Sequence, residues 1–461
     1  MPVIRTWQLT AGATAVGLAL AAGAVAVAGP WDSGQRRAER EWAAGDRPPG
    51  GAPGPERPAP APAPSAPAVL SPLGARAATA PADGKPGGLG EELAPLLDDP
   101  ALGALRTASV VDATTGRRLY GKGEAEPMTP ASTIKIATAA AALTALGPDH
   151  RIPTSVVASG RELTLVGGGD ASLDRAMLRT LAERTARALR ERKTGSVELA
   201  YDTSLYAGDP MHPIGVNGNL APVTALMVDQ GRIDAESRGS SERSDDPAGE
   251  AARTFARMLS ERGVRITASP APGRAADDAR ALAEVRSRPL SALVERMLTD
   301  SDNDIAESLA RQTAVAGGRK ASFAGAERAV REQLARLKVP LAGARFADGS
   351  GLDRKGRLPA RLLTALLARS AEPGRPELRT VLTGLPVAGF NGTLESRYPG
   401  DSPGTGLIRA KTGTLTGVNT LSGTVAAPDG RLLAFAFLAG KTPARDPAQD
   451  ALDRLASALA S

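Results

Sequence analysis

The chain has 461 residues, of which 42% are hydrophobic and only 3% aromatic, and it contains no cysteine. This composition excludes a wholly disordered chain, and it also excludes disulfides, thiolate nucleophiles and zinc sites built from cysteine. Two histidines are too few for a histidine-rich metal centre, and a net charge of +6 without a basic tract interleaved with aromatics favours solvated arginines over nucleic-acid binding.

An apolar run from Leu9 to Ala28 follows a short N-terminal stretch with one basic side chain. Its small-x-small end suits signal peptidase, and its length of about 20 residues also suffices to span a bilayer. Residues 1–28 are therefore expected to be a signal peptide or a membrane anchor, with the rest of the chain extracytoplasmic. Residues 29–89 are rich in Pro, Ala and Gly, which predicts a disordered, semi-rigid linker.

Folded sequence is expected from about Gly90, and the first candidate site within it is the pair Ser132 and Lys135. Pro130 and the alanine-rich sequence downstream predict a helix at this point. Positions i and i+3 share a helix face, so a lysine with a lowered pKa can take the proton of the serine hydroxyl. The pattern S-x-x-K is frequent by chance, and a helix N-terminus with an exposed lysine is its structural alternative.

The second candidate, Ser301-Asp302-Asn303, lies at a polar break between two helical patterns. A hydroxyl at this place can relay a proton, and the Asn303 amide can hold a substrate carbonyl. The same residues also suit an N-cap cluster for a helix over Ile305–Ala314, which is compatible with the functional interpretation.

The third candidate, Lys411-Thr412-Gly413, lies in a strand-like segment that further strands are predicted to follow at Leu421–Ala426 and Leu432–Ala439, joined by a turn at Pro428-Asp429-Gly430. On an edge strand these residues supply positive potential, a hydroxyl for a carboxylate, and room for a substrate against the backbone. The structural alternative is an ordinary strand with a solvated lysine. A second K-T-G, Lys193-Thr194-Gly195, ends a charged helical pattern, where Gly195 is expected to cap the helix.

These three elements in this order resemble the penicilloyl-serine transferases. Stretches such as VGGGD (Val166–Asp170), FADGSGLDR and LPVAGFNGTLESR narrow the resemblance to the D-alanyl-D-alanine carboxypeptidase/endopeptidase family of low-molecular-mass penicillin-binding proteins, from about Gly90 to the C-terminus. Longer members of that family carry a larger insertion between S-x-x-K and S-x-N. Here only the short polar stretch Ala235–Asp246 stands where a nested extra domain is expected.

The resemblance implies an α/β (α+β) fold with a β-lactamase/transpeptidase-like catalytic domain at residues 90–150 and 285–461. An antiparallel sheet is expected from strands at Ala108–Asp112 and Arg118–Tyr120 together with the C-terminal strands, with a C-terminal helix at Pro447–Ala460 and a helical lobe that holds Ser132. One inserted accessory domain is expected at residues 151–284.

The resemblance also implies a serine-type D-Ala-D-Ala carboxypeptidase or DD-endopeptidase that acts on peptidoglycan stem peptides, is acylated by penicillin, and lies in the cell wall or on the outer face of the plasma membrane. Ser132 is expected to be the nucleophile, Lys135 its base and Ser301 the proton relay to the departing D-Ala. The substrate contacts implied are positioning and polarisation by Asn303 and Lys411, an oxyanion hole from the backbone N–H groups of Ser132 and Thr414, carboxylate binding by Thr412 and Thr414, space at Gly413, and a stem-peptide carboxylate at Arg354. No metal, cofactor or nucleic acid is implied; stem peptides and β-lactam inhibitors are the expected partners.

Three alternatives are weaker. A class A β-lactamase needs E-x-x-x-N and a class C enzyme needs Y-x-N, and neither pattern occurs. An α/β-hydrolase would use the G-x-S-x-G match at Gly400–Gly404, but Pro403 lacks the N–H that an oxyanion hole needs there, and both histidines precede Ser402. A catalytically idle wall-binding scaffold with this fold stays open.

Overall fold

The computed structural model describes residues 88–234, 240–398 and 400–461. The predicted signal peptide or anchor at residues 1–28, and all of the predicted linker at residues 29–89 except its last two positions, lie outside the described residues. Within the described ranges, no helix is both long enough and apolar enough to cross a membrane.

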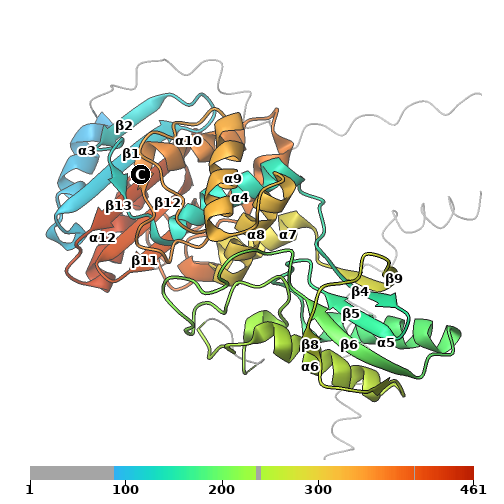
Figure 1. Ribbon diagram of the computed structural model, residues 1–461. Helices are drawn as coiled ribbons and strands as arrows, with labels where there is room; N and C mark the ends of the chain where they lie inside the picture. The colour runs from blue at the N-terminus through green and yellow to red at the C-terminus, as the bar shows by residue number, and fades with distance from the viewer. Residues whose placement is uncertain (1–87, 235–239, 399) are drawn as a thin grey trace, which may run out of the picture. The chain divides into compact units, whose positions relative to one another are not determined.

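A five-stranded antiparallel sheet joins the beginning of the described chain to its end (Figure 1). The strand order is β11 (Ile408–Leu415), β12 (Val418–Ala426), β13 (Leu432–Gly440), β1 (Leu105–Asp112) and β2 (Arg118–Lys122). The strands and the turn that the sequence predicts all lie in this sheet. β11 is an edge strand, as the K-T-G motif requires.

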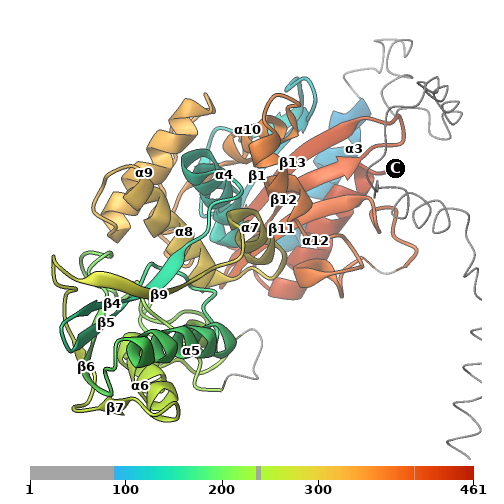
Figure 2. The ribbon, with the colours of Figure 1, turned by 90° about the vertical axis from the view of Figure 1, so that its right-hand side faces the viewer.

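Successive side chains of β13 belong to two different cores, because side chains alternate across a strand. Phe435 and Phe437 join the cluster beneath α3 (Gly88–Leu97) and α12 (Arg445–Ala458). Ala434 and Ala436 join the cluster that includes α10 (Ala360–Ala371) and the helical lobe. Figures 1 and 2 show these helices on the two faces of the sheet. Burial on both faces explains why β13 is a continuous apolar run rather than an alternating one.

The helical lobe consists of α4 (Lys135–Leu146), α7 (Leu290–Thr299), α8 (Asn303–Ala316) and α9 (Phe323–Arg336). Every residue of α4 from Lys135 to Leu143 is buried, and five of them are alanines at positions 137 and 139–142. Such small side chains let neighbouring helices approach closely, so α4 fits among α7, α8 and α9 without bulky aromatics. The predicted helical lobe and antiparallel sheet are confirmed.

A second sheet forms between residues 153 and 286, with the order β7 (Arg265–Ile266), β6 (Ser196–Asp202), β5 (Glu162–Val166), β4 (Pro153–Ser159) and β9 (Arg280–Arg286), and with β8 (Ala271–Pro272) beside β6. β5 and β6 are parallel because α5 (Arg175–Glu191) connects them as a crossover helix. α5 and α6 (Pro247–Ser260) pack against this sheet around their own core, which contains Leu181 and Phe255 (Figure 2).

The end of α5 corrects one prediction: Gly195 does not cap the helix. Lys193 takes the left-handed conformation, with φ +57°, and the N–H of Thr194 donates to the carbonyl of Leu189 at 2.9 Å. Gly195 instead leads into β6, and its carbonyl accepts the N–H of Arg265, the first residue of β7. The chain therefore turns two residues earlier than the glycine suggests, because β6 pairing begins immediately after it.

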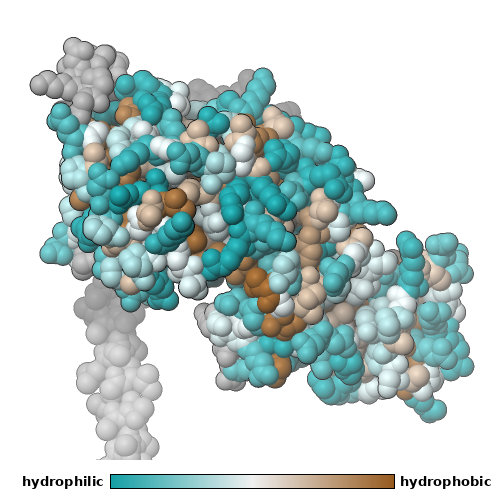
Figure 3. Space-filling model, turned by 60° about the vertical axis from the view of Figure 1, so that its left-hand side comes forward, coloured by the Kyte–Doolittle hydropathy of each residue, from teal (hydrophilic) through white to brown (hydrophobic). Residues whose placement is uncertain are grey.

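Short elements complete the described chain. They are η1 (Pro100–Leu102), β3 (Pro127–Met128), η2 (Ala131–Ile134), η3 (Asp229–Gly231), β10 (Leu358–Pro359), η4 (Pro376–Leu378), α11 (Arg379–Thr383) and η5 (Gly392–Leu394). The face drawn in Figure 3 is mostly hydrophilic, with apolar residues in several small, separate areas. Such a surface fits the high content of solvated arginine that the composition predicts.

Candidate active site

Ser132 lies in the turn η2, directly before α4, and is half-buried. The preceding Ala131 has φ +47°, an uncommon value for a residue with a Cβ atom. The carbonyl of Pro130 accepts hydrogen bonds from the hydroxyl of Thr133 at 2.7 Å and from that of Thr420 on β12 at 2.9 Å. These bonds fix the turn against the sheet, so the serine has a defined position at the junction of lobe and sheet.

Lys135 is fully buried, and its amine contacts three oxygens. The Nζ atom donates to Ser132 Oγ at 2.9 Å, to Asn303 Oδ1 at 2.7 Å and to the carbonyl of Ser350 at 2.8 Å. Burial lowers the pKa of Lys135 to about 8, while the carboxylates of Asp348 and Glu307 oppose that shift. A substantial neutral fraction is therefore available near neutral pH.

The S-x-N element lies where α7 ends and α8 begins, and its residues cap α8 and contact Lys135. Asp302 caps α8 by accepting the N–H of Ile305 at 3.0 Å, as the N-cap interpretation predicts. Ser301 has φ +60°, and such strained conformations of non-glycine residues gather at functional sites. Asn303 accepts from Lys135 and donates through Nδ2 to the carbonyl of Asn219 at 3.0 Å.

Lys411 is fully buried on β11, in register with Ser422 of β12. Burial holds its pKa well below the usual value, the charge of Lys135 acts in the same direction, and Asp300 opposes both. Lys411 is thus an electrostatic neighbour of Lys135 and of Asp300, the residue directly before the S-x-N element. Its Nζ donates only to the backbone carbonyl of Thr412, at 3.0 Å, among the described residues.

Gly413 lets β11 pass against turn η2. A Cβ atom at this position would lie 2.1 Å from Thr420 Oγ1, 2.8 Å from the carbonyl oxygen of Pro130 and 3.1 Å from Ala131 Cβ. The glycine is required by this close approach, which places the K-T-G strand immediately beside the residues that precede Ser132.

The other predicted substrate contacts also lie along or next to β11. The Thr412 hydroxyl donates to Thr393 Oγ1 at 2.8 Å, and Thr414 Oγ1 accepts from Gln449 of α12 at 3.1 Å. Arg354 donates to the carbonyl of Thr416 at 2.9 Å, just beyond the end of the strand. Sequence reasoning missed Thr393 and Gln449, since neither belongs to a catalytic motif.

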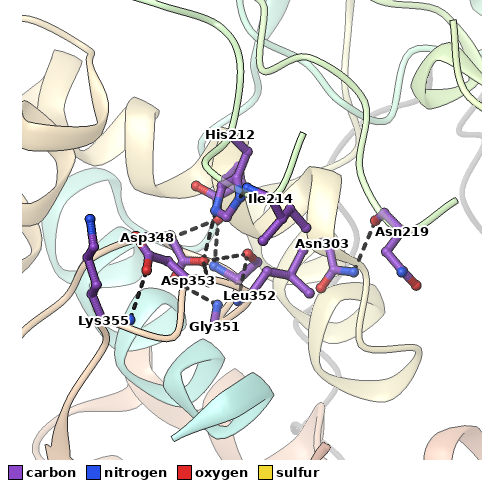
Figure 4. A network of polar contacts seen from close by, with 12 residues as sticks. His212, Ile214, Asn219, Asn303, Asp348, Gly351, Leu352, Asp353 and Lys355 are labelled. Atoms are coloured by element: carbon purple, nitrogen blue, oxygen red, sulfur yellow. Dashed lines mark hydrogen bonds and ion pairs between the residues drawn. The ribbon is translucent and has the colours of Figure 1, made fainter. Parts of the chain in front are cut away.

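A buried network behind Lys135 was also missed, and Figure 4 shows the part of it around His212 and Asp348. Glu307 accepts the N–H groups of Gly349 and Ser350 at 3.0 and 2.8 Å, and Asp348 lies opposite His212 at 3.1 Å. Burial raises the pKa of Glu307, and the Asp348 carboxylate raises it further. The only signal in the sequence was the stretch FADGSGLDR, from which Arg354 alone was selected.

In the described part of the chain, His212, Glu307 and Asp348 are the one group with the composition of a metal site, with candidate ligand atoms within 4.8 Å of one another. Both ring nitrogens of His212 already take part in hydrogen bonds, as do carboxylate oxygens of Glu307 and Asp348. We therefore interpret the group as a hydrogen-bond network.

Ser402 would be the nucleophile of the α/β-hydrolase alternative, but among the described residues its hydroxyl has no hydrogen bond to a histidine. Its hydroxyl pairs with that of Ser457 at 3.2 Å. His212 faces Asp348 instead. That alternative is not supported.

A model of the D-Ala-D-Ala carboxypeptidase 3 (S13) family matches residues 89–240 and 232–459. The chain belongs to this family. A carboxypeptidase of Mycobacterium tuberculosis is 37% identical over 396 residues, which cover 81% of this chain and 83% of the relative. A D-alanyl-D-alanine carboxypeptidase of Actinomadura sp. is 31% identical over 451 residues, covering 78% and 82%.

The fold is also that of a solved penicillin-binding protein. Penicillin binding protein 4 from Haemophilus influenzae has a TM-score of 0.67 at 21% sequence identity, and the match covers 81% of this chain and 98% of that one. The family match confirms the predicted family, and the structural match confirms the predicted fold class. The protein is a serine-type D-Ala-D-Ala peptidase, which makes it a hydrolase.

Proposed function

We propose that this peptidase cleaves the D-Ala-D-Ala end of peptidoglycan stem peptides, or the equivalent cross-link, through an acyl-enzyme on Ser132 with Lys135 as the general base. The observation that carries the proposal is the surroundings of the Lys135 amine. A neutral amine has two N–H groups and one lone pair. Asn303 Oδ1 and the Ser350 carbonyl can accept the two N–H groups, which leaves the lone pair for the hydroxyl hydrogen of Ser132.

In the acylation step, Ser132 Oγ bonds to the carbonyl carbon of the penultimate D-Ala while Lys135 takes the hydroxyl proton. The C–N bond to the terminal residue then breaks, and Ser301 relays a proton to the departing amine. The backbone N–H groups of Ser132 and Thr414 stabilise the oxyanion, an interaction whose loss typically costs about 10²–10³ in rate. Water hydrolyses the ester and restores the serine.

Lys411 is assigned the positioning of the substrate together with Asn303. Two ammonium groups this deeply buried repel each other, which is why the charge of Lys135 lowers the pKa of Lys411. A substrate carboxylate on Thr412 and Thr414 would reverse that balance and favour the charged form of Lys411. Lys411 would thereby carry its positive charge mainly when the substrate carboxylate is bound.

Arg354 is proposed to meet a second carboxylate of the stem peptide. Its guanidinium donates to the carbonyl of Thr416, which follows the C-terminal end of β11. Gly413 is proposed to serve the site by letting β11 run against turn η2, since the space that a Cβ would need is filled by Thr420, Pro130 and Ala131 rather than left for a substrate.

Residues 90–150 and 285–461 are proposed to form the catalytic domain and residues 151–284 an inserted accessory domain, in line with the separate core of the second sheet. Because peptidoglycan lies outside the cytoplasmic membrane, we propose that the protein acts there, secreted or anchored by residues 1–28. Stem peptides and β-lactams are its proposed partners.

The experiment that tests the proposal is labelling with a fluorescent penicillin. Stable label on the wild type and none on Ser132→Ala is the expected result, and Ser402→Ala, at the serine of the α/β-hydrolase alternative, serves as the matched control. Equal label on Ser132→Ala, or no label on the wild type, would favour the idle scaffold. Rapid loss of the label would favour a β-lactamase. Product analysis on purified muropeptides then separates carboxypeptidase from endopeptidase activity.

A further inference from the structure

His212 stands out as a buried side chain in an otherwise exposed stretch of the segment between β6 and η3. Its side chain is 1% exposed, whereas Met211 and Ile214 on either side are each 40% exposed. The ring of Phe323 on α9 packs edge-on against the imidazole, with ring centroids 5.4 Å apart. The proposed catalytic steps make no use of this histidine, so its burial calls for another explanation.

The hydrogen bonds of the ring define where its proton lies. The N–H of Ile214 donates to Nδ1 at 3.3 Å, so this nitrogen carries the lone pair. Nε2 therefore carries the hydrogen and donates to Asp348 Oδ2 at 3.1 Å. Both contacts are visible in Figure 4. The imidazole is thus oriented as a donor toward one carboxylate.

Asp348 in turn organises the loop that follows it. Its Oδ2 accepts the hydroxyl of Ser350 at 3.1 Å and the N–H of Asp353 at 2.7 Å, and its Oδ1 accepts the N–H of Gly351 at 2.9 Å. A carboxylate that already accepts these bonds holds the loop in one conformation when its own orientation is fixed. His212 supplies that orientation from outside the loop.

This loop touches Lys135 and the turn η2 that contains Ser132. The Ser350 carbonyl accepts from Lys135 Nζ at 2.8 Å. Gly351 has φ +86°, and a Cβ atom there would lie 2.0 Å from the carbonyl oxygen of Ala131 and 2.9 Å from Ile134 Cγ2. A displacement of the loop by a fraction of an ångström is therefore transmitted to Lys135 and to turn η2.

The same segment reaches the other acceptor of the lysine as well. The carbonyl of Asn219 accepts from Asn303 Nδ2, and Asn303 Oδ1 accepts from Lys135. The segment from His212 to Asn219 therefore contacts Asn303, one acceptor of the Lys135 amine, directly. It reaches the other acceptor, the Ser350 carbonyl, through Asp348 (Figure 4).

We infer that His212 is a positioning residue for catalysis: through Asp348 it holds the Ser350 carbonyl in place, so that the lone pair of Lys135 stays directed at the Ser132 hydroxyl. This inference rests on the proposed role of Lys135 as the base. His212 does not touch the substrate or the reacting atoms.

The test compares two substitutions at one position. His212→Phe keeps a ring against Phe323 but removes the donor to Asp348. His212→Gln has an amide N–H that can reach where Nε2 lies, so it retains the donor. Stopped-flow acylation by a fluorescent penicillin over a range of concentrations gives the maximal acylation rate constant and the apparent Kd separately.

We expect His212→Phe to lower the maximal acylation rate on the order of 10- to 100-fold, as for misplacement of a catalytic group, with Kd changed by less than about threefold. His212→Gln is expected to recover most of that loss. Phe323→Leu is the matched control, since it alters the packing of the imidazole but none of these hydrogen bonds, and it should acylate at close to the wild-type rate. Thermal unfolding of each variant accompanies the kinetics.

An unchanged acylation rate in His212→Phe, or an equal loss in His212→Gln and Phe323→Leu, would overturn the inference. If His212→Phe does not fold, Ser350→Ala takes its place, because it deletes the hydroxyl bond to Asp348 in the same network; wild-type acylation in that variant overturns the inference too. Absence of label on the wild type would instead refute the proposed function, so the two failures are distinguishable.

Discussion

The pH dependence of acylation follows from the buried position of Lys135. Only the neutral amine can accept the serine proton, and burial lowers its pKa to about 8. At pH 7 roughly a tenth of the amine is then neutral, compared with roughly 0.03% for a lysine at its ordinary pKa, so burial raises the reactive population about 300-fold. The rate constant for acylation should therefore rise about tenfold per pH unit below pH 8 and level off above it.

The sign of this dependence is set by which protonation form reacts. The charged amine dominates below the pKa and cannot act as a base, so activity is lost as the pH falls. The carboxylates of Asp348 and Glu307 stabilise the charged form and keep the pKa from falling further. Glu307→Gln removes one of them and should therefore move the midpoint to lower pH.

The assay is the second-order rate constant of acylation by a fluorescent penicillin between about pH 5.5 and 10, with folding checked by circular dichroism at each pH. Lys135→Arg is the control, because a guanidinium stays charged throughout this range, and it should show no detectable acylation. A flat profile in the wild type, or a midpoint above pH 10, would refute the assignment of Lys135 as the base. A midpoint in Glu307→Gln that moves upward would refute the electrostatic part of the reasoning.

Two further predictions concern stability and packing. The ion pair between Arg243 and Asp304 spans 3.0 Å, and both side chains are 2% exposed. Arg243→Met should therefore lower the free energy of unfolding by about 3–5 kcal/mol in urea titrations. The double variant with Asp304→Asn should recover part of that loss, and additive effects would contradict the pairing. Gly413→Ala should slow acylation and destabilise the fold by about 1–3 kcal/mol, because its Cβ meets Thr420 and the Pro130 carbonyl. Gly374→Ala, which has open space at its Cβ and no positive φ, should not slow acylation, and wild-type acylation in Gly413→Ala would show that the strand can shift freely.

Local sequence was sufficient for the elements that carry the motifs. The helix after Ser132, the N-cap at Asp302 and the strands around Lys411 were predictable because capping, turn chemistry and continuous apolar runs are properties of neighbouring residues. The motif order also identified the family. At the end of α5, local reasoning was wrong, since Lys193 rather than Gly195 takes the left-handed conformation. The strand pairing of β6 decided that position, and strand pairing cannot be predicted from local propensities.

The juxtaposition of Ser132 and Lys135 is what the sequence by itself determined, because i and i+3 on one helical turn must lie side by side. Only the tertiary structure gives that lysine the lowered pKa that its proposed role as a base requires. Its full burial, the acceptors on Asn303 and Ser350, and the carboxylates behind them come from segments more than 160 residues away. The same holds for His212, which reaches Asp348 across 136 positions. A pKa depends on desolvation and on charges brought together in space, and neither is written in the neighbouring sequence.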